Sequence, residues 1–576
     1  MKLTLNLRLL LILLAVLMAL TACTGGNAQN ADSSETVSAS VVEKETETAT
    51  ETEEETEVET EAPLTEYRAS ISKSRAELEE MLTLQDEEFG AAQEKLKAFE
   101  ELALVSSDYD AVDALYMEFE DAYFHIETQI GIANVIYYMN TTNSAASERY
   151  LHAYDLFGDL HNAYIESCKN IYNNSPIRDR LFEDWTEDEI AELFAYDPKL
   201  QELREENEEL LVELNALPDE EFTDRSAEIY AILVTNNNEI AELSGYENYY
   251  LYASDRIYGR DYDIEDIERF ASYVQTYYLP NQAKINLNWQ MKYAKLSAAN
   301  SSAMYKFLYD PFDKWKTNYV EGYLDSFEGS MYDGLNHMFD NRNLVFASSK
   351  NSHQSAFQTY LSEYETPFCL FGCNGQSATT IIHEMGHYYA ALYNDDVFSY
   401  DLAETQSQTN EILFLAYLAD EMPAEVYEVV RGYSLYNFMV QSIICVVIDE
   451  FERQVYSLES VEGYTSEDFD AIMEAVCEKY GGASYIKNAI VDINMYWRLT
   501  ATNSPVYYIS YAVSNTESLN IFAIAEQDEA AARELYRILI EETEEVDGFL
   551  SAVDKAGLAS PFEEELFEGV LEMMLK

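Results

Sequence analysis

Basic residues are scarce in this 576-residue chain. It contains 35 Lys and Arg against 107 Asp and Glu, which gives a formal net charge of −72. Binding to nucleic acid requires clustered basic side chains that neutralise phosphates, so this composition argues against a nucleic-acid partner. Proline and glycine are also few, at 10 and 20 residues. A β-sandwich or a propeller needs a turn about every ten residues, so neither fold suits this chain.

Cysteine is too sparse for a disulfide framework. Six cysteines are present, and five remain if Cys23 belongs to the leader described below. Five is an odd number, and only Cys369 and Cys373 lie close together in sequence, so we expect buried thiols. A metal pair at Cys369 and Cys373 is the alternative, although no second pair of cysteines would complete it. Hydrophobic residues make up 48% of the chain and tyrosines number 46, which favours a large core.

The first residues are typical of an export signal. Lys2 and Arg8 flank the start of an apolar run that ends at Leu20 and is too short to cross a bilayer comfortably. The next residues, Leu-Thr-Ala-Cys over 20–23, resemble a bacterial lipobox, in which Cys23 carries the lipid. We therefore expect a signal peptide over 1–22 and an extracytoplasmic protein anchored to the bacterial cell membrane through Cys23. No further membrane-spanning helix is expected.

A Thr- and Glu-rich segment follows the leader. Residues 24–64 carry 12 Asp and Glu against one Lys and show no apolar period. Such a segment repels itself and stays extended, so residues 23–64 are predicted to be a disordered tether. An acidic binding tail is the alternative.

From Tyr67 onward, apolar residues recur at the three- and four-residue spacing of helices almost throughout. Two short apolar runs, Asn343–Ser348 and Thr366–Phe371, predict strands instead. The fold class is therefore mainly all-α, with an N-terminal helical region over 65–205 and a second domain over 206–576. The clearest helical ranges are 76–101, 109–140, 187–217, 225–243, 264–296, 409–420, 424–457, 466–479, 529–544 and 554–576.

The segment that carries chemistry is His-Glu-Met-Gly-His over residues 383–387. His383 and His387 are four residues apart, so on a helix both imidazoles leave the same face and can bind one zinc ion. Glu384 follows the first ligand directly, where it can act as a general base toward a water at the metal. A chance occurrence of the motif in a structural helix is the alternative.

A third metal ligand must come from elsewhere in the chain. Ala390 and Tyr393 occupy the places where the metzincin motif has Gly and His, which excludes that class. No histidine follows His387, so a carboxylate is expected. Glu404 is favoured by spacing, and Glu411, seven residues later on the same helix face, would accept a hydrogen bond from a ligand histidine. A solvated acidic face is the alternative for Glu404. The other candidates are Asp395, Asp396 and Asp401.

At this point the sequence resembles a known family. The 383–387 motif, followed by Ala-Glu-x-x-Ser-x-x-Asn-Glu over 403–411, is similar to the oligoendopeptidase F branch of the thimet oligopeptidase family of zinc peptidases. Ser355-Ala356-Phe357 lies where that family has a Gly-Ala-Phe turn, and Pro367-Phe368 where it has a strand lining the cleft. The resemblance covers most of 245–576. It implies a two-lobed helical gluzincin with a deep substrate groove and a small β-sheet near the active site.

Carried over residue by residue, the resemblance implies that Zn²⁺ is bound by His383, His387 and Glu404, with Glu384 as base. It also implies that 206–576 is the catalytic domain. The expected partners are short peptides, which would pair as an added strand along Pro367–Phe371. We expect a monomer.

A tyrosine cluster over 504–514 resembles the family's Pro-x-Tyr-Tyr-Ile-x-Tyr block. The resemblance implies that Tyr511 stabilises the oxyanion and that Tyr508 contacts substrate, with Tyr507 and Phe368 as further substrate-binding residues. Without it, the tyrosines would be core or groove lining.

The chain departs from the family where a histidine is expected ten or eleven residues before the last Tyr. Ala501 and Thr500 stand there. The loss of that transition-state donor leaves two main hypotheses: a zinc-dependent oligoendopeptidase, or a weakly active or inactive peptide-binding lipoprotein on the same fold. A structural helical surface protein without metal is a third.

Overall fold

The structure is a computed structural model that describes most of the chain from residue 65 onward. The predicted leader, Cys23 and the tether lie outside the described residues and stay predictions. The description covers residues 65–576 apart from 184, 186–189, 191–197, 216, 218, 298, 303–313, 315–318, 394–398, 482–492, 544–545 and 547.

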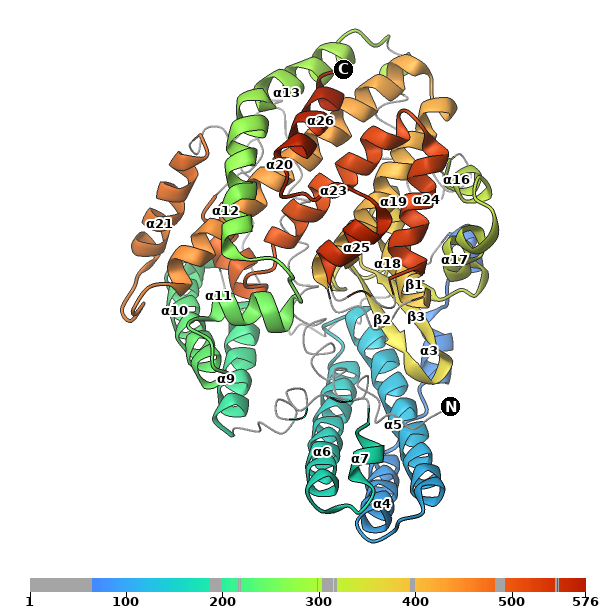
Figure 1. Ribbon diagram of the computed structural model, residues 1–576. Helices are drawn as coiled ribbons and strands as arrows, with labels where there is room; N and C mark the ends of the chain where they lie inside the picture. Colours follow the sequence, from blue (N-terminus) through green and yellow to red (C-terminus); the bar gives the residue numbers. More distant parts are fainter. Residues whose placement is uncertain are drawn as a thin grey trace, which may run out of the picture.

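A bundle of long helices forms the N-terminal body, which projects from the larger body (Figure 1). Its helices α4, α5 and α6 pack around their own core of buried aromatic and aliphatic side chains, with Phe119 and Tyr164 at its centre. The helices of this region are α2 (Glu66–Ile71), α3 (Arg75–Met81), α4 (Asp86–Ala103), α5 (Tyr109–Tyr138), α6 (Ser144–Asn174) and α7 (Arg178–Leu181).

The single helix predicted over 76–101 is wrong, because the chain turns between α3 and α4. The Gln129 side chain of α5 accepts hydrogen bonds from the backbone N–H groups of Thr83 and Leu84 at 2.6 and 3.2 Å. These donors are thereby satisfied from outside the helix, so the interruption is stabilised by a tertiary contact that periodicity does not reveal.

The larger body is also helical and contains the main hydrophobic core. The predicted boundary at 205/206 lies inside α9. Its elements are α9 (Pro198–Asn215), α10 (Asp219–Leu243), α11 (Tyr249–Tyr252), η2 (Ala253–Ile257), α12 (Ile264–Tyr273), η3 (Val274–Tyr278), α13 (Leu279–Tyr293), α16 (Glu321–Asp325), α17 (Gly329–Asp340), α18 (Ala378–Tyr393), α19 (Tyr400–Glu421), α20 (Ala424–Tyr456), α21 (Ser466–Lys479), η6 (Tyr496–Ala501), α23 (Ile509–Ala525), α24 (Glu529–Glu541), α25 (Phe549–Ala556) and α26 (Glu564–Leu575).

Helix α20 is long and apolar enough to cross a membrane by length and composition, with a mean hydropathy of 1.3 in its most apolar stretch. The expectation of no further membrane-spanning helix stays a prediction. In α20, 78% of that stretch is buried inside the protein. A core helix passes the same test, so α20 is weak evidence for a membrane span.

A three-stranded sheet of order β1-β3-β2 lies between the two bodies. Its strands are β1 (Leu344–Phe346), β2 (Ala356–Leu361) and β3 (Thr366–Phe371), and the 3₁₀ turn η5 (Ser362–Tyr364) joins β2 to β3. Strands β1 and β3 confirm the two predicted apolar runs. The expected turn at Ser355-Ala356-Phe357 is instead the start of β2, which pairs antiparallel with β3 from Ala356 opposite Phe371.

The two faces of β3 bury side chains in different cores. Phe368 and Leu370 pack with residues of α5, such as Ile132 and Ile136. Cys369 and Phe371 point the other way, into the main core. This alternation follows from the two-residue period of a strand, and it joins the two bodies through one small sheet.

Candidate metal centre

Helices α18 and α19 supply the predicted metal-binding residues, and a glycine lets them approach closely. A Cβ atom added at Gly386 would lie 2.6 Å from the Ser407 Cα and 2.8 Å from the Gln406 carbonyl oxygen. The Asn410 amide of α19 also donates a 2.7 Å hydrogen bond to the Ile382 carbonyl of α18. Gly386 and Asn410 therefore fix the distance between the two helices that carry the site.

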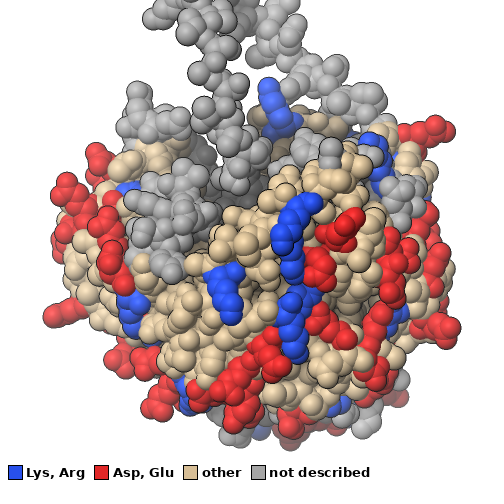
Figure 2. Space-filling view, turned by 90° about the horizontal axis from the view of Figure 1, so that it is seen from above, with Lys and Arg blue, Asp and Glu red and all other residues tan. Residues whose placement is uncertain are grey.

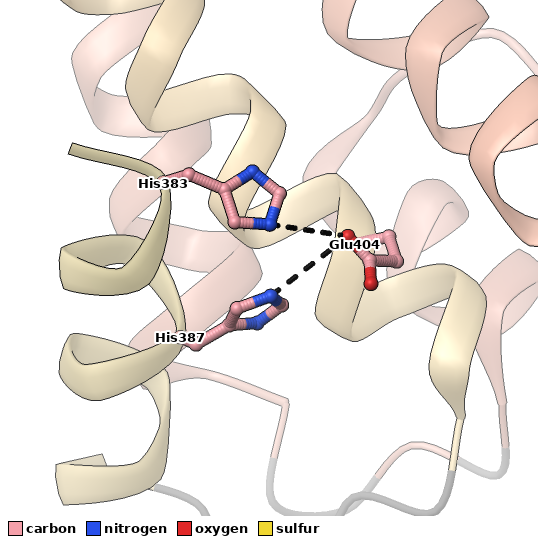
Figure 3. A group of neighbouring side chains, drawn as sticks. All are labelled: His383, His387 and Glu404. Atoms are coloured by element: carbon pink, nitrogen blue, oxygen red, sulfur yellow. Dashed lines mark ion pairs between the residues drawn. The ribbon is translucent and has the colours of Figure 1, made fainter. Parts of the chain in front are cut away.

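The three predicted ligands converge on one point (Figure 3). His383 Nε2 lies 3.5 Å from Glu404 Oε2, and His387 Nε2 lies 3.8 Å from the same oxygen. One ligand atom from each residue lies within 4.8 Å of the others. Ligands bound to a tetrahedral zinc at about 2.0 Å are separated by roughly 3.4 Å, so the arrangement suits such an ion. Glu404 is only 4% exposed, which rules out a solvated acidic face.

Glu411 holds the ring of His383. Its Oε1 lies 2.8 Å from His383 Nδ1. The Nδ1–H group donates this bond, which turns Nε2 toward Glu404, where a bound metal ion would take the place of the Nε2 proton. The predicted partnership of Glu404 and Glu411, one turned to the metal position and one to a histidine, is therefore present in the structure.

The electrostatic environment favours a bound cation. Burial lowers the pKa of His387 to about 4, so this imidazole is neutral, as a metal ligand must be. Burial alone would also lower the pKa of His383, but Glu411 and the neighbouring carboxylates raise it to about 9. Burial raises the pKa of Glu384 to about 7, with further contributions from nearby charges. Three carboxylates around two imidazoles thus attract positive charge, and the donor set fits zinc.

Of the other candidate carboxylates, the structure describes Asp401, which does not join this cluster. Asp401 is fully buried, but its Oδ1 accepts a 3.1 Å hydrogen bond from Tyr262, and its Oδ2 lies 3.8 Å from Arg260 Nε. It is therefore partnered elsewhere. Asp395 and Asp396 lie outside the described residues.

The tyrosine cluster reaches the metal position from the start of α23. Tyr507 donates a hydrogen bond to Glu404 Oε1, and the Tyr507 and Tyr511 hydroxyl oxygens lie 3.2 Å apart. Tyr508 and Tyr511 are partly exposed, whereas Tyr507 is only 4% exposed. The position of Tyr511 suits the oxyanion role predicted for it, and the exposure of Tyr508 suits contact with a substrate.

Two residues expected to bind substrate lie elsewhere. Tyr507 is buried and its hydroxyl donates a hydrogen bond to Glu404, so it orients the side chain of this candidate ligand instead. Phe368 is 1% exposed and packs against α5, because its position on β3 faces the N-terminal body. Sequence reasoning missed both placements, since each depends on a partner about one hundred residues or more away.

The expected site of the missing histidine is closed. Thr500 and Ala501 are 2% and 0% exposed in the π-helical turn η6, and the Thr500 side chain hydrogen bonds with Tyr508. Neither side chain replaces a histidine as a proton donor.

Comparison with known proteins identifies the fold. No protein-family profile and no curated protein matches the sequence. Among solved structures, PZ peptidase A with an inhibitor superposes with a TM-score of 0.63 at 18% identity, over 85% of this chain and 97% of that one. A protein assigned as oligoendopeptidase F from Bacillus anthracis str. Ames gives 0.63 at 17% identity, over 84% and 95%. This chain has the oligoendopeptidase F fold.

The oligoendopeptidase-F of Enterococcus faecium superposes with a TM-score of 0.50 at 15% identity, over 85% of this chain and 96% of that one. The chain thus spans nearly the full length of proteins with the oligoendopeptidase F fold. The predicted fold class is confirmed, and the resemblance inferred from the 383–411 motifs agrees with these superpositions.

Proposed function

We propose that this protein is a zinc-dependent oligopeptidase that hydrolyses short peptides. The observation that carries the proposal is the convergence of His383, His387 and Glu404 beside the buried carboxyl of Glu384. A buried glutamate next to such a donor set is the arrangement of a metal-assisted hydrolase. The fold of the peptidases named above supports the same reaction class.

His383, His387 and Glu404 would hold the zinc, which when bound would supply a Lewis acid and lower the pKa of a water molecule. Glu384 accepts the proton of the attacking water and passes it to the leaving amine, a role that its raised pKa suits. Tyr511 donates its hydroxyl proton to the oxygen that gains negative charge. The Tyr511 hydroxyl oxygen lies 3.2 Å from that of Tyr507, which donates its own proton to Glu404.

The peptide cannot pair with β3 as predicted, because β3 is the central strand. Both of its edges are taken, by β1 over Cys369–Phe371 and by β2 over Thr366–Phe371. Among the described residues, the outer edge of β2 has no strand partner, and Gln358, Thr359 and Tyr360 are partly exposed. We therefore infer that a peptide substrate would lie along β2, where its main chain would extend the sheet.

A second candidate is a peptide-binding protein with little turnover. The closed site of Thr500 and Ala501 favours it, since no histidine assists the transition state there. In both cases the lipid on Cys23 would hold the protein at the outer side of the membrane, where it would meet extracytoplasmic peptides.

The experiment that separates the two candidates uses purified protein with a measured zinc content. Wild type and Glu384→Gln are offered internally quenched peptides of five to fifteen residues. We expect one zinc per chain in both proteins, and cleavage by wild type that is at least ~10²-fold faster than by the variant. Removal of zinc with a chelator should abolish cleavage, and added zinc should restore it. Bound zinc with equal, negligible rates would favour the peptide-binding protein.

A further inference from the structure

The loop before α23 is held by a set of buried side chains that come from distant segments. We propose that Tyr258, Arg260 and Glu452, here called the loop clamp, position Tyr507 and through it the metal ligand Glu404. The inference rests on the proposed metal site and assigns positioning residues to it.

Three consecutive backbone carbonyls of the loop accept hydrogen bonds from the clamp. The Tyr258 hydroxyl donates to the Pro505 carbonyl at 2.7 Å. Arg260 Nη2 donates to the carbonyls of Val506 at 2.7 Å and, more weakly, Tyr507 at 3.4 Å. The same nitrogen lies 3.0 Å from the Ser510 hydroxyl in the first turn of α23. Arg260 thus ties the loop to the helix that carries Tyr511.

Glu452 of α20 completes the clamp from the other side. Its Oε1 accepts a 2.6 Å hydrogen bond from the Val506 N–H. The Arg260 side chain and the Glu452 residue are fully buried, so these bonds are made without competition from water. The N–H group and the carbonyl group of Val506 are therefore both held by buried side chains.

The backbone of Val506 explains why the loop needs holding. Its φ angle is 65°, in the left-handed region, where a β-branched residue is rarely found. Such a conformation persists only when surrounding contacts impose it. The next residue, Tyr507, stacks against Tyr258 with ring centroids 5.7 Å apart and donates to Glu404. A change in the loop would move the hydroxyl that orients this metal ligand.

The test measures zinc affinity of the full chain by competition with a chelator. The proteins are wild type, Arg260→Met, Tyr507→Phe and the double variant. Each single change should weaken zinc binding by about 10- to 100-fold. The double variant should bind zinc no more than about threefold less tightly than the single variant with the lower affinity, since both changes act through one hydroxyl. Additive losses, or unchanged affinity in Arg260→Met, would overturn the proposal.

Arg431→Met is the matched structural control. Arg431 is 6% exposed and also donates to a backbone carbonyl, that of Met573, far along the chain from the site. The Arg431→Met substitution should lower the melting temperature and leave zinc affinity unchanged. If Arg260→Met does not fold, Glu452→Leu and Glu452→Gln replace it. The Gln variant keeps an acceptor for the Val506 N–H and should bind zinc as wild type does. The Leu variant has no such acceptor and should bind zinc more weakly.

A glycine at the strained position gives a second readout. Val506→Gly accepts the left-handed conformation without the clamp, so in the Arg260→Met background it should restore zinc affinity to within about threefold of wild type. Zinc affinity is independent of peptide cleavage, so a chain that binds zinc but cleaves nothing still tests the clamp. If wild type binds no zinc, the proposed function fails. A crystal structure of Arg260→Met then decides whether the loop clamp positions Tyr507. If Tyr507 still donates its hydrogen bond to Glu404 in that structure, the inference is contradicted.

Discussion

Tyr511 is partly exposed beside the candidate metal site, where its hydroxyl would donate to a substrate. Tyr507 gives its proton to Glu404, and its oxygen lies 3.2 Å from that of Tyr511. Tyr511→Phe should therefore lower kcat by about 10²- to 10³-fold with a smaller change in KM. Steady-state kinetics on one quenched peptide measure this. Tyr427→Phe, on the first turn of α20, is the control and should keep the wild-type rate.

For the neighbouring Tyr508, we expect the effect of substitution to fall on KM more than on kcat. Tyr508 is partly exposed and hydrogen bonds with Thr500, so its removal should raise KM more than it lowers kcat. The assignment of Tyr511 as oxyanion donor is wrong if Tyr508→Phe carries the larger loss in kcat.

The candidate metal-binding residues could be predicted because helical spacing places each pair on one helix face and the family resemblance relates the two pairs. His383 and His387 are one turn apart, and Glu404 and Glu411 are two turns apart on the next long helix. The role of Tyr507 could not be predicted in this way. Its partner Glu404 is 103 residues distant, and the intervening loop turns at Val506 in a conformation that the residue type disfavours.

At the scale of elements, the contact of α18 with α19 decides whether the ligands converge. Gly386→Ala would place a methyl group against backbone atoms of Gln406 and Ser407, which cannot move aside as a side chain can. We expect it to destabilise the protein by about 1 to 3 kcal/mol and to weaken zinc binding. Urea unfolding and a chelator titration measure the two effects.

Gly90→Ala provides the matched control. Gly90 lies in α4, and a Cβ atom there would have no neighbour within 4 Å. This change should stabilise the protein by up to about 1 kcal/mol through helix propensity and leave zinc binding unaltered. Equal effects of the two substitutions would show that the close approach of α18 and α19 is not needed.

The N-terminal bundle contains two buried groups whose protonation works in opposite directions. Burial lowers the pKa of His161 to about 4, from an ordinary value of 6.5. Its contribution to stability is therefore present above pH 6.5 and is lost as the pH falls toward 4. Burial raises the pKa of Glu127 from 4.5 to about 7, so its contribution is present below pH 4.5 and is lost as the pH rises toward 7.

Between pH 4.5 and 6.5 the two contributions nearly cancel in wild type. Relative to wild type, Glu127→Gln should make the free energy of unfolding rise with pH by up to about 1.4 kcal/mol per unit, because only His161 then titrates. His161→Gln should make it fall by a similar amount. Urea unfolding at half-unit pH steps measures both slopes, and slopes of equal sign would contradict the assignment.

For the whole molecule, composition and periodicity predicted the helical class and the two strands that are apolar throughout. They did not predict β2, whose Gln358, Thr359 and Tyr360 break the apolar run. Nor did they show that the sheet joins two bodies. That arrangement depends on contacts such as Phe368 with α5, which bring together segments more than two hundred residues apart.

The net charge of −72 is also a property of the whole molecule. The tether carries 12 acidic residues and one lysine, so most of the charge belongs to the folded part. Acidic side chains are spread over the face shown in Figure 2, with basic ones fewer among them. A field of one sign acts over about 10 Å at 0.1 M salt and raises the local concentration of opposite charges.

We therefore expect cationic peptides to be cleaved faster than anionic ones of matched length and scissile bond. The preference should lie in kcat/KM, because the field acts on encounter rather than on the chemical step. It should shrink as salt rises from about 0.02 to 0.5 M, since the Debye length falls over that range from about 20 to 4 Å. A preference that survives 0.5 M salt would indicate contacts within the site instead, and equal rates for Lys-rich and Glu-rich peptides at low salt would contradict the expectation.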